Sequence, residues 1–152
     1  MYYAIVISLM GVLPALSIAF EASLVHSSVG WPLIGKWFVF WAGGVRLLLA
    51  GLRQVAQPAY TAKHLLGIEG SDVYLVVREL GYANIAFGTV GIFSLRAPGW
   101  TGAAALAGGI FYGLAGVNHV LQRQRNRLQN TAMVSDLFAA VVLLGYCLWR
   151  LG

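Results

Sequence analysis

The chain has 152 residues, of which 59% are hydrophobic and 10% charged, and its mean hydropathy is +0.76. Because a soluble domain has about a quarter of its residues charged, this composition excludes a soluble globular protein and predicts an all-α membrane protein. The net charge of +5 is spread along the chain and clusters only at Arg123, Arg125 and Arg127, which argues against nucleic-acid binding and leaves the lipid bilayer as the partner.

Five segments have the roughly 20 mostly apolar residues that a membrane span requires. The first contains Pro14, where we expect a kink, and lacks the basic start and cleavage site of a removable signal peptide. The sequence therefore predicts a polytopic transmembrane helical bundle of five spans, which forms a single integral membrane domain over residues 1–152. If the first segment lay in the interface, four spans would remain. The predicted spans are 2–25, 33–52, 73–95, 100–121 and 131–149.

The segment between the second and third predicted spans is the longest polar stretch of the chain. Pro58 is expected to end the second helix, because proline cannot continue a helix through its own position. The residues that follow, 59–70, are expected to form either a short interfacial helix or a re-entrant turn.

The basic residues of the loops predict the orientation. With five spans, one side carries five basic loop residues and the other carries three. Cytoplasmic loops are enriched in arginine and lysine, so the N-terminus is expected in the cytoplasm and the protein in the inner (plasma) membrane. At the other side Glu21 is expected to cap its helix or to pair with Lys36. The five tryptophans, which form an expected aromatic belt there, are Trp31, Trp37, Trp41, Trp100 and Trp149.

Ionisable and amide residues inside the predicted spans fall at similar depths. At about 1.5 Å per residue, four spans carry their charge within about 10 Å of the arginine-rich interface. Small residues surround several of these positions, which indicates faces turned toward other helices. A buried polar cluster is therefore predicted, consisting of Arg46, Arg78, Glu79, Tyr82, Asn84, His119 and Asp136.

Three interpretations of this cluster are open. It is a salt-bridge network that fixes helix register, or a binding site for a small polar or amphipathic molecule such as a lipid or quinone, or a catalytic site. In the last case Glu79 or Asp136 accepts a proton and His119 relays it. No complete catalytic motif and no metal-ligand spacing is found, so an enzyme is the least favoured of the three. A haem would need His64 and His119 to face each other.

Small residues recur at helical spacing in the third and fourth predicted spans. Such stripes let helix backbones approach closely in lipid, within the bundle or between copies in a homo-oligomer. The residues concerned are Gly81, Gly88, Gly91, Ala105, Gly109 and Gly113.

The segment 41–52, with its arginine inside a glycine- and leucine-rich span, resembles the DoxX-like small bacterial membrane proteins. The segments 78–84, 108–116 and 135–138 resemble more closely an uncharacterised bacterial membrane family of about 150 residues. The resemblance implies a four-helix core plus an added N-terminal span. It also implies an association with membrane redox enzymes that pass electrons to quinone, either as a quinone-binding protein or as a subunit of a larger complex.

Overall fold

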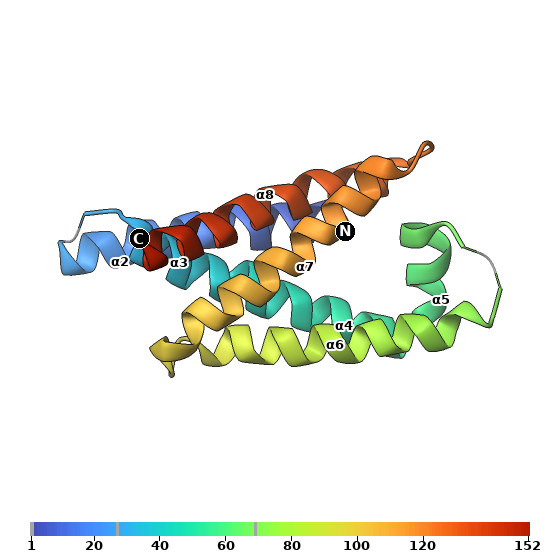
Figure 1. Ribbon diagram of the computed structural model, residues 1–152, viewed down its shortest axis with the longest axis horizontal. Helices are drawn as coiled ribbons and strands as arrows, with labels where there is room; N and C mark the ends of the chain where they lie inside the picture. Colours follow the sequence, from blue (N-terminus) through green and yellow to red (C-terminus); the bar gives the residue numbers. More distant parts are fainter. Residues whose placement is uncertain (1, 27, 69) are drawn as a thin grey trace.

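The computed structural model describes residues 2–26, 28–68 and 70–152, and the regular structure within these ranges is entirely helical. Five long helices run back and forth between the two ends of an elongated molecule (Figure 1). One end, which we call the arginine-rich end, carries the start of the first helix, a short helix after the second, and the arginine loop 122–126. The opposite end carries two connecting turns and the C-terminus.

The first long helix, Tyr2–Val25, contains a π-helical turn directly before Pro14. Proline has no N–H to donate to the preceding turn, and wider turns of this kind accommodate such local irregularities in a helix. The structure therefore has a π-helical turn next to the position where the sequence predicts a kink. The parts of this helix are α1 (Tyr2–Ile7), η1 (Ser8–Val12) and α2 (Leu13–Val25).

The second long helix, Trp31–Ala56, also contains a π-helical segment, eight residues long. Its parts are α3 (Trp31–Phe38), the π-helical η2 (Val39–Arg46) and α4 (Leu47–Ala56). As predicted, the helix ends just before Pro58. A short helix follows, made of α5 (Pro58–Tyr60) and η3 (Thr61–Leu66).

The remaining long helices are α6 (Val73–Phe93), α7 (Thr101–Leu121), which is entered through the short η4 (Pro98–Trp100), and α8 (Arg127–Leu151). α8 begins four residues before the predicted start of the last span. The side chain of Asn126 accepts a hydrogen bond from the backbone N–H of Gln129 at 2.9 Å, and the Gln129 side chain accepts one from the Asn126 N–H at 2.8 Å. This capping box satisfies backbone donors in the first turn and starts the helix early.

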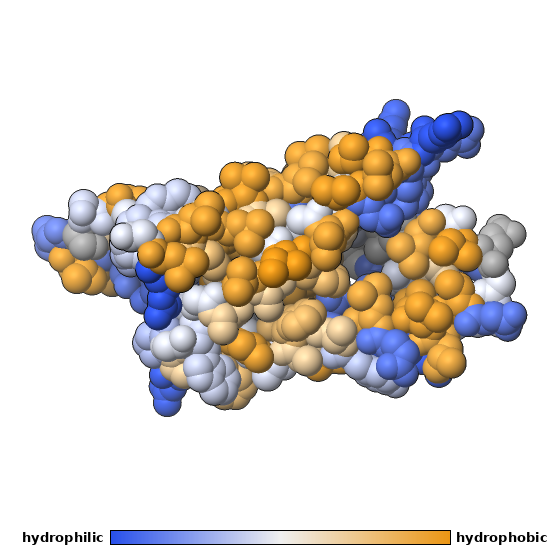
Figure 2. All heavy atoms as spheres, in the orientation of Figure 1, coloured by the Kyte–Doolittle hydropathy of each residue, from blue (hydrophilic) through white to orange (hydrophobic). Residues whose placement is uncertain are grey.

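Four of the long helices are long and apolar enough to cross a membrane: Tyr2–Val25, Trp31–Ala56, Pro98–Leu121 and Arg127–Leu151. α6 is long enough but less apolar, because it carries Arg78, Glu79 and Asn84. Figure 2 shows hydrophobic side chains over the middle of the visible face and hydrophilic ones toward its ends. This distribution fits a multi-pass membrane protein.

The second long helix and α6 pack with their backbones almost in contact. A Cβ atom placed on Gly91 would lie 2.6 Å from the Gly44 nitrogen, and one on Gly51 would lie 2.6 Å from the Gly81 oxygen. Only glycine fits at such distances. The predicted glycine stripe of the third span therefore serves packing within the bundle.

α7 and α8 form the other closely packed helix pair. Gly109 of α7 faces the side chain of Leu144, and Gly113 faces the Cβ of Ala140. The predicted small-residue stripe of this span thus lies against α8. The core that these helices share with the first two includes the fully buried Tyr112 and Leu143.

Polar contacts near the opposite end tie the first long helix to the second. Lys36 Nζ donates to both carboxylate oxygens of Glu21 at 2.8 Å, and Trp37 Nε1 donates to Glu21 Oε2 at 2.8 Å. Trp41 Nε1 donates to Ser17 Oγ at 2.9 Å. The predicted pairing of Glu21 with Lys36 is confirmed.

Candidate functional site: a buried ion pair beside an apolar groove

A salt bridge between the second long helix and α8 is the most buried charged feature among the described residues. Arg46 Nη2 lies 2.9 Å from Asp136 Oδ1, and their side chains are 14% and 9% exposed. The same nitrogen donates to Ser135 Oγ at 3.3 Å. Two residues of the predicted cluster, separated by 90 positions in the chain, are thus joined inside an apolar bundle.

An aromatic side chain completes the surroundings of Arg46. Its guanidinium carbon lies 5.0 Å from the ring centroid of Tyr112 in α7, close enough for a cation–π interaction. The Tyr112 hydroxyl donates to the Ala42 carbonyl at 2.7 Å. Ala42 lies in the π-helical η2, so α7 adds a hydrogen bond to the irregular stretch of helix that ends at Arg46. Tyr2 of the first helix lies near the same guanidinium.

The energetics of this pair depend on both partners being present. Moving two charges out of water is costly, and their mutual attraction and extra hydrogen bonds offset that cost. Removing one partner of a buried pair costs about 3–5 kcal/mol, because the other charge stays buried and uncompensated. The Arg46–Asp136 pair therefore joins α8 to the second helix, and the loss of either partner is expected to be costly.

His119 and the loop after α7 lie toward the arginine-rich end of this pair. His119 is half-buried, within electrostatic reach of Asp136, and its Nδ1 lies 3.4 Å from Gln122 Oε1. Arg125 Nη1 donates to the carbonyls of His119, Val120 and Gln122. This arginine therefore caps the C-terminus of α7, a role that its position in a basic cluster does not reveal.

Asn84 lies in a separate polar contact between α6 and α4. Its Nδ2 donates to Gln54 Oε1 at 2.8 Å, and both residues are buried. Asn84 Oδ1 has no hydrogen-bond partner among the described residues. Gln54 lies in the predicted polar exit of the second span, and sequence reasoning did not assign it to the cluster.

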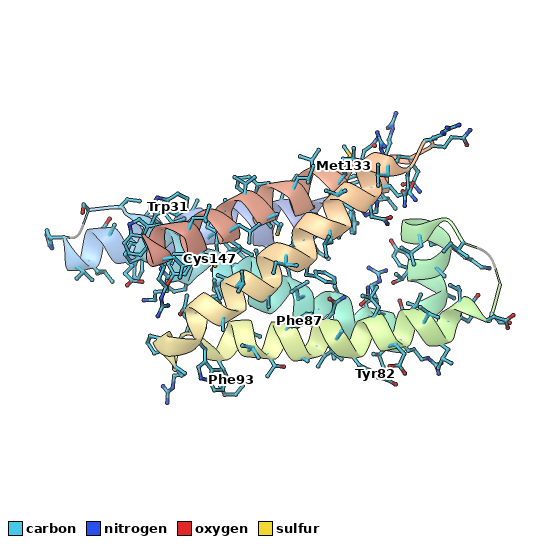
Figure 3. The ribbon with its side chains drawn as sticks, viewed as in Figure 1. Trp31, Tyr82, Phe87, Phe93, Met133 and Cys147 are labelled. Carbon is cyan, nitrogen blue, oxygen red and sulfur yellow. The ribbon has the colours of Figure 1, made fainter. Side chains whose placement is uncertain are left out.

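Three residues of the predicted cluster lie on the surface of α6. Arg78 and Glu79 are exposed, and Tyr82 is 52% exposed and points away from the bundle in Figure 3. The helical face that carries Val77, Gly81 and Asn84 packs inward instead. The prediction rested on depth, and depth alone does not fix the direction in which a side chain points. The structure therefore does not bring Arg78, Glu79 or Tyr82 to the Arg46–Asp136 pair.

An apolar groove of about 540 Å³ runs along the outside of the bundle between the first helix and α8. Ser135 lines this groove and also contacts Arg46, so the groove wall and the ion pair share a side chain. Sequence reasoning did not predict the groove. At Gly11, one of its lining residues, a Cβ would meet no atom within 4 Å. The lining residues are Val6, Ile7, Met10, Gly11, Asn130, Thr131, Val134, Ser135 and Phe138.

The second cavity, of about 220 Å³, lies between the second helix, α6 and α7. It is lined by glycine, alanine, valine and phenylalanine, including Phe87, which Figure 3 labels. A cavity without a polar group orients no polar ligand. The groove beside Ser135 is therefore the better candidate for binding.

The histidines considered for haem lie on different elements. His64 is in η3, where its ring lies 4.8 Å from that of Tyr60, and its backbone carbonyl accepts a hydrogen bond from Asn126 Nδ2 at 3.1 Å. Among residues 2–26, 28–68 and 70–152, no group of three His, Cys, Asp or Glu side chains is placed to hold a metal ion.

Over residues 1–151 the chain matches a family described as "Family of unknown function (DUF6790)", and it belongs to that family. The expected membership in an uncharacterised family of about 150 residues agrees with this match, whereas nothing in the comparisons supports a relation to the DoxX-like proteins. No curated protein and no solved structure shows significant similarity to the chain.

Proposed function

We propose that this protein is a five-span membrane protein that holds an amphipathic molecule, a lipid or a quinone, in the groove between its first helix and α8. The observation that carries this proposal is the position of the groove beside the ion pair. A mostly apolar groove or pocket with a small number of polar groups is the usual form of a ligand site. Here Asn130 and Thr131 lie at one end of the lining and Ser135 lies midway along it.

Five spans are supported by the dimensions of α6. Its 21 residues extend about 31 Å at 1.5 Å per residue, close to the roughly 30 Å thickness of the hydrocarbon core. Arg78 and Glu79 lie within two turns of its start, where long side chains reach the interface. The excess of basic loop residues at the arginine-rich end favours a cytoplasmic location for that end, in the plasma membrane.

The ion pair supports binding by holding the groove wall in place. Arg46 fixes α8 through Asp136 and also orients the Ser135 hydroxyl, which donates to the Ala132 carbonyl at 3.0 Å. The proposal gives these charges a positioning role. It assigns no chemistry to them.

The test is to fill the groove. Gly11→Phe places a ring in open space, whereas Val12→Phe adds the same ring at a neighbouring exposed position that does not line the groove. Wild type and both variants are purified in mild detergent, and retained small molecules are extracted and identified by mass spectrometry. We expect wild type and Val12→Phe to retain the same lipid or quinone and Gly11→Phe to lose it. Equal retention by all three folded proteins would overturn the proposal.

The second candidate is an accessory subunit of a larger membrane complex, such as a redox complex, with the ion pair as a purely structural network. The observation in its favour is the exposed face of α6, where Arg78 and Glu79 lie near the exposed Tyr82. Polar residues in a span more often face protein than lipid. Stoichiometric co-purification of another chain that Arg78→Leu releases, together with no ligand in the groove, would favour this candidate. A second copy of this chain in place of a foreign one would indicate a homo-oligomer.

A further inference from the structure

We infer that the molecule in the groove is an anionic phospholipid, whose phosphate lies at Arg127 and whose acyl chain lies along Val134 and Phe138. This inference rests on the proposed function and names the chemical class of the ligand. It comes from the order of side chains along α8. Arg127 is followed at helical spacing by Thr131, then Val134 and Ser135, then Phe138, so these residues share one face.

The length of this face matches a phospholipid. Phe138 lies eleven positions after Arg127, which corresponds to about 16 Å along the helix axis. The polar residues lie at the arginine-rich end and the apolar ones deeper, in the same order as the phosphate, ester groups and chain of a lipid. A quinone, whose polar ring has no charge, would leave the basic end of this face unused.

The charge at the mouth of the groove favours an anion. Arg127 is exposed one turn before the lining residues Asn130 and Thr131. Arg125 Nε donates to Asn130 Oδ1 at 3.0 Å, which holds a second positive charge at the mouth and directs the Asn130 amide. The two amide hydrogens of Asn130 are donors suited to a phosphate or ester oxygen. The residues that line the groove include no acidic side chain.

The opposing wall also fits a lipid. Val6, Ile7 and Met10 line it with apolar side chains, and Tyr3 lies one turn closer to the arginine-rich end on the same face of the helix. Tyrosine is enriched at the level of lipid headgroups, where its ring is in apolar surroundings and its hydroxyl is hydrated. An acyl chain between the two walls would fill the groove and contact the apolar side chains of both helices.

The experiment measures which lipid is bound. The full-length protein is placed in detergent micelles with equal amounts of phosphatidylglycerol and phosphatidylcholine of identical acyl chains, and bound lipid is counted by native mass spectrometry. An arginine near the surface favours an anionic lipid about fivefold. We therefore expect wild type to prefer phosphatidylglycerol, and Arg127→Gln to reduce that preference about fivefold with phosphatidylcholine binding unchanged. Arg96→Gln, which removes an exposed charge at the opposite end, serves as the matched control and should leave the preference intact.

The two levels of the proposal fail in different ways. If Gly11→Phe binds both lipids as wild type does, the groove is not the site and the proposed function fails. If Gly11→Phe loses both lipids but Arg127→Gln keeps the wild-type preference, the groove binds an amphipathic molecule and the phosphate assignment is wrong. A wild type that binds both lipids equally also overturns the assignment. Circular dichroism and size-exclusion profiles like those of wild type establish that each variant is folded.

Discussion

The second long helix contacts its neighbours in two different ways. Against α6 it presents Gly44, Gly51 and the backbone near Leu48, and the two backbones nearly touch. Against α8 it presents Arg46, which reaches across to Asp136. Nearer the opposite end the same two helices also pack closely, with Gly35 against Tyr146 and Gly145 against Trp31. The glycine contact brings two backbones together through many small van der Waals interactions. The ionic contact is made by one long side chain that spans the distance between two helices.

This difference explains where the molecule has room for a ligand. Backbones that touch through glycine leave little space between them. At the level of Asp136 the second helix is joined to α8 by an ion pair and not by such a backbone contact. The groove lies on the outer side of α8, between α8 and the first long helix. In this bundle the glycine contacts join the second helix to α6, and the groove lies on the other side of that helix, beside the buried ion pair.

The largest expected effect comes from breaking the ion pair. Arg46→Met or Asp136→Leu alone leaves one buried charge without its partner and should lower the free energy of unfolding by about 3–5 kcal/mol. The double variant Arg46→Met/Asp136→Leu removes both charges and should recover most of that loss. Reversible unfolding in detergent micelles measures all four proteins as a double-mutant cycle. Additive losses in the double variant would mean that the two charges do not act as a pair.

The sequence predicted a cluster of seven polar residues and no particular pair. Two of its members, Arg46 and Asp136, form an ion pair in the structure. Arg78 and Glu79 satisfied the same depth criterion, yet they lie on the exposed face of α6. The inward face of α6 is marked in the sequence by the helical spacing of Val77, Gly81, Asn84 and Gly88. This periodicity predicts that Arg78 and Glu79 point outward, whereas their depth alone does not.

The long helices could be predicted from composition. Features that depend on particular side-chain hydrogen bonds were harder to predict. The long apolar segments appear as helices, and the glycine stripes appear at close helix contacts, as the sequence predicts. The early start of α8 depended on the capping box at Asn126 and Gln129, which is a readable signal that was missed. The groove was not predictable, because it arises from the separation of two helices distant in the chain.

A smaller effect is expected from adding one carbon atom on the glycine face. A Cβ on Gly88 would lie 2.8 Å from the Gly44 oxygen and from the Leu48 Cα, so the two helices must separate. Gly88→Ala should therefore lower the free energy of unfolding by about 1–3 kcal/mol, the usual cost of overpacking. Gly11→Ala is the matched control, because its Cβ meets nothing and alanine favours helix by about 0.5–1 kcal/mol. Replacing glycine by alanine is thus expected to lower the free energy of unfolding at position 88 and to raise it at position 11. A stabilised Gly88→Ala protein would show that the α4–α6 contact is not rigid.

The neutral polar pair on the glycine face should give a single-variant loss of similar size and a double-variant change that is the smallest of the series. Asn84→Leu alone removes the hydrogen bond to Gln54 and leaves a buried amide unpaired, which costs about 1–3 kcal/mol. The double variant Gln54→Leu/Asn84→Leu removes every donor and acceptor, including the Asn84 Oδ1 that has no partner among the described residues, and its stability should be close to that of wild type or slightly higher. The same unfolding measurement applies. A double variant much less stable than either single one would contradict this expectation and would mean that the two amides stabilise the α4–α6 contact beyond satisfying each other.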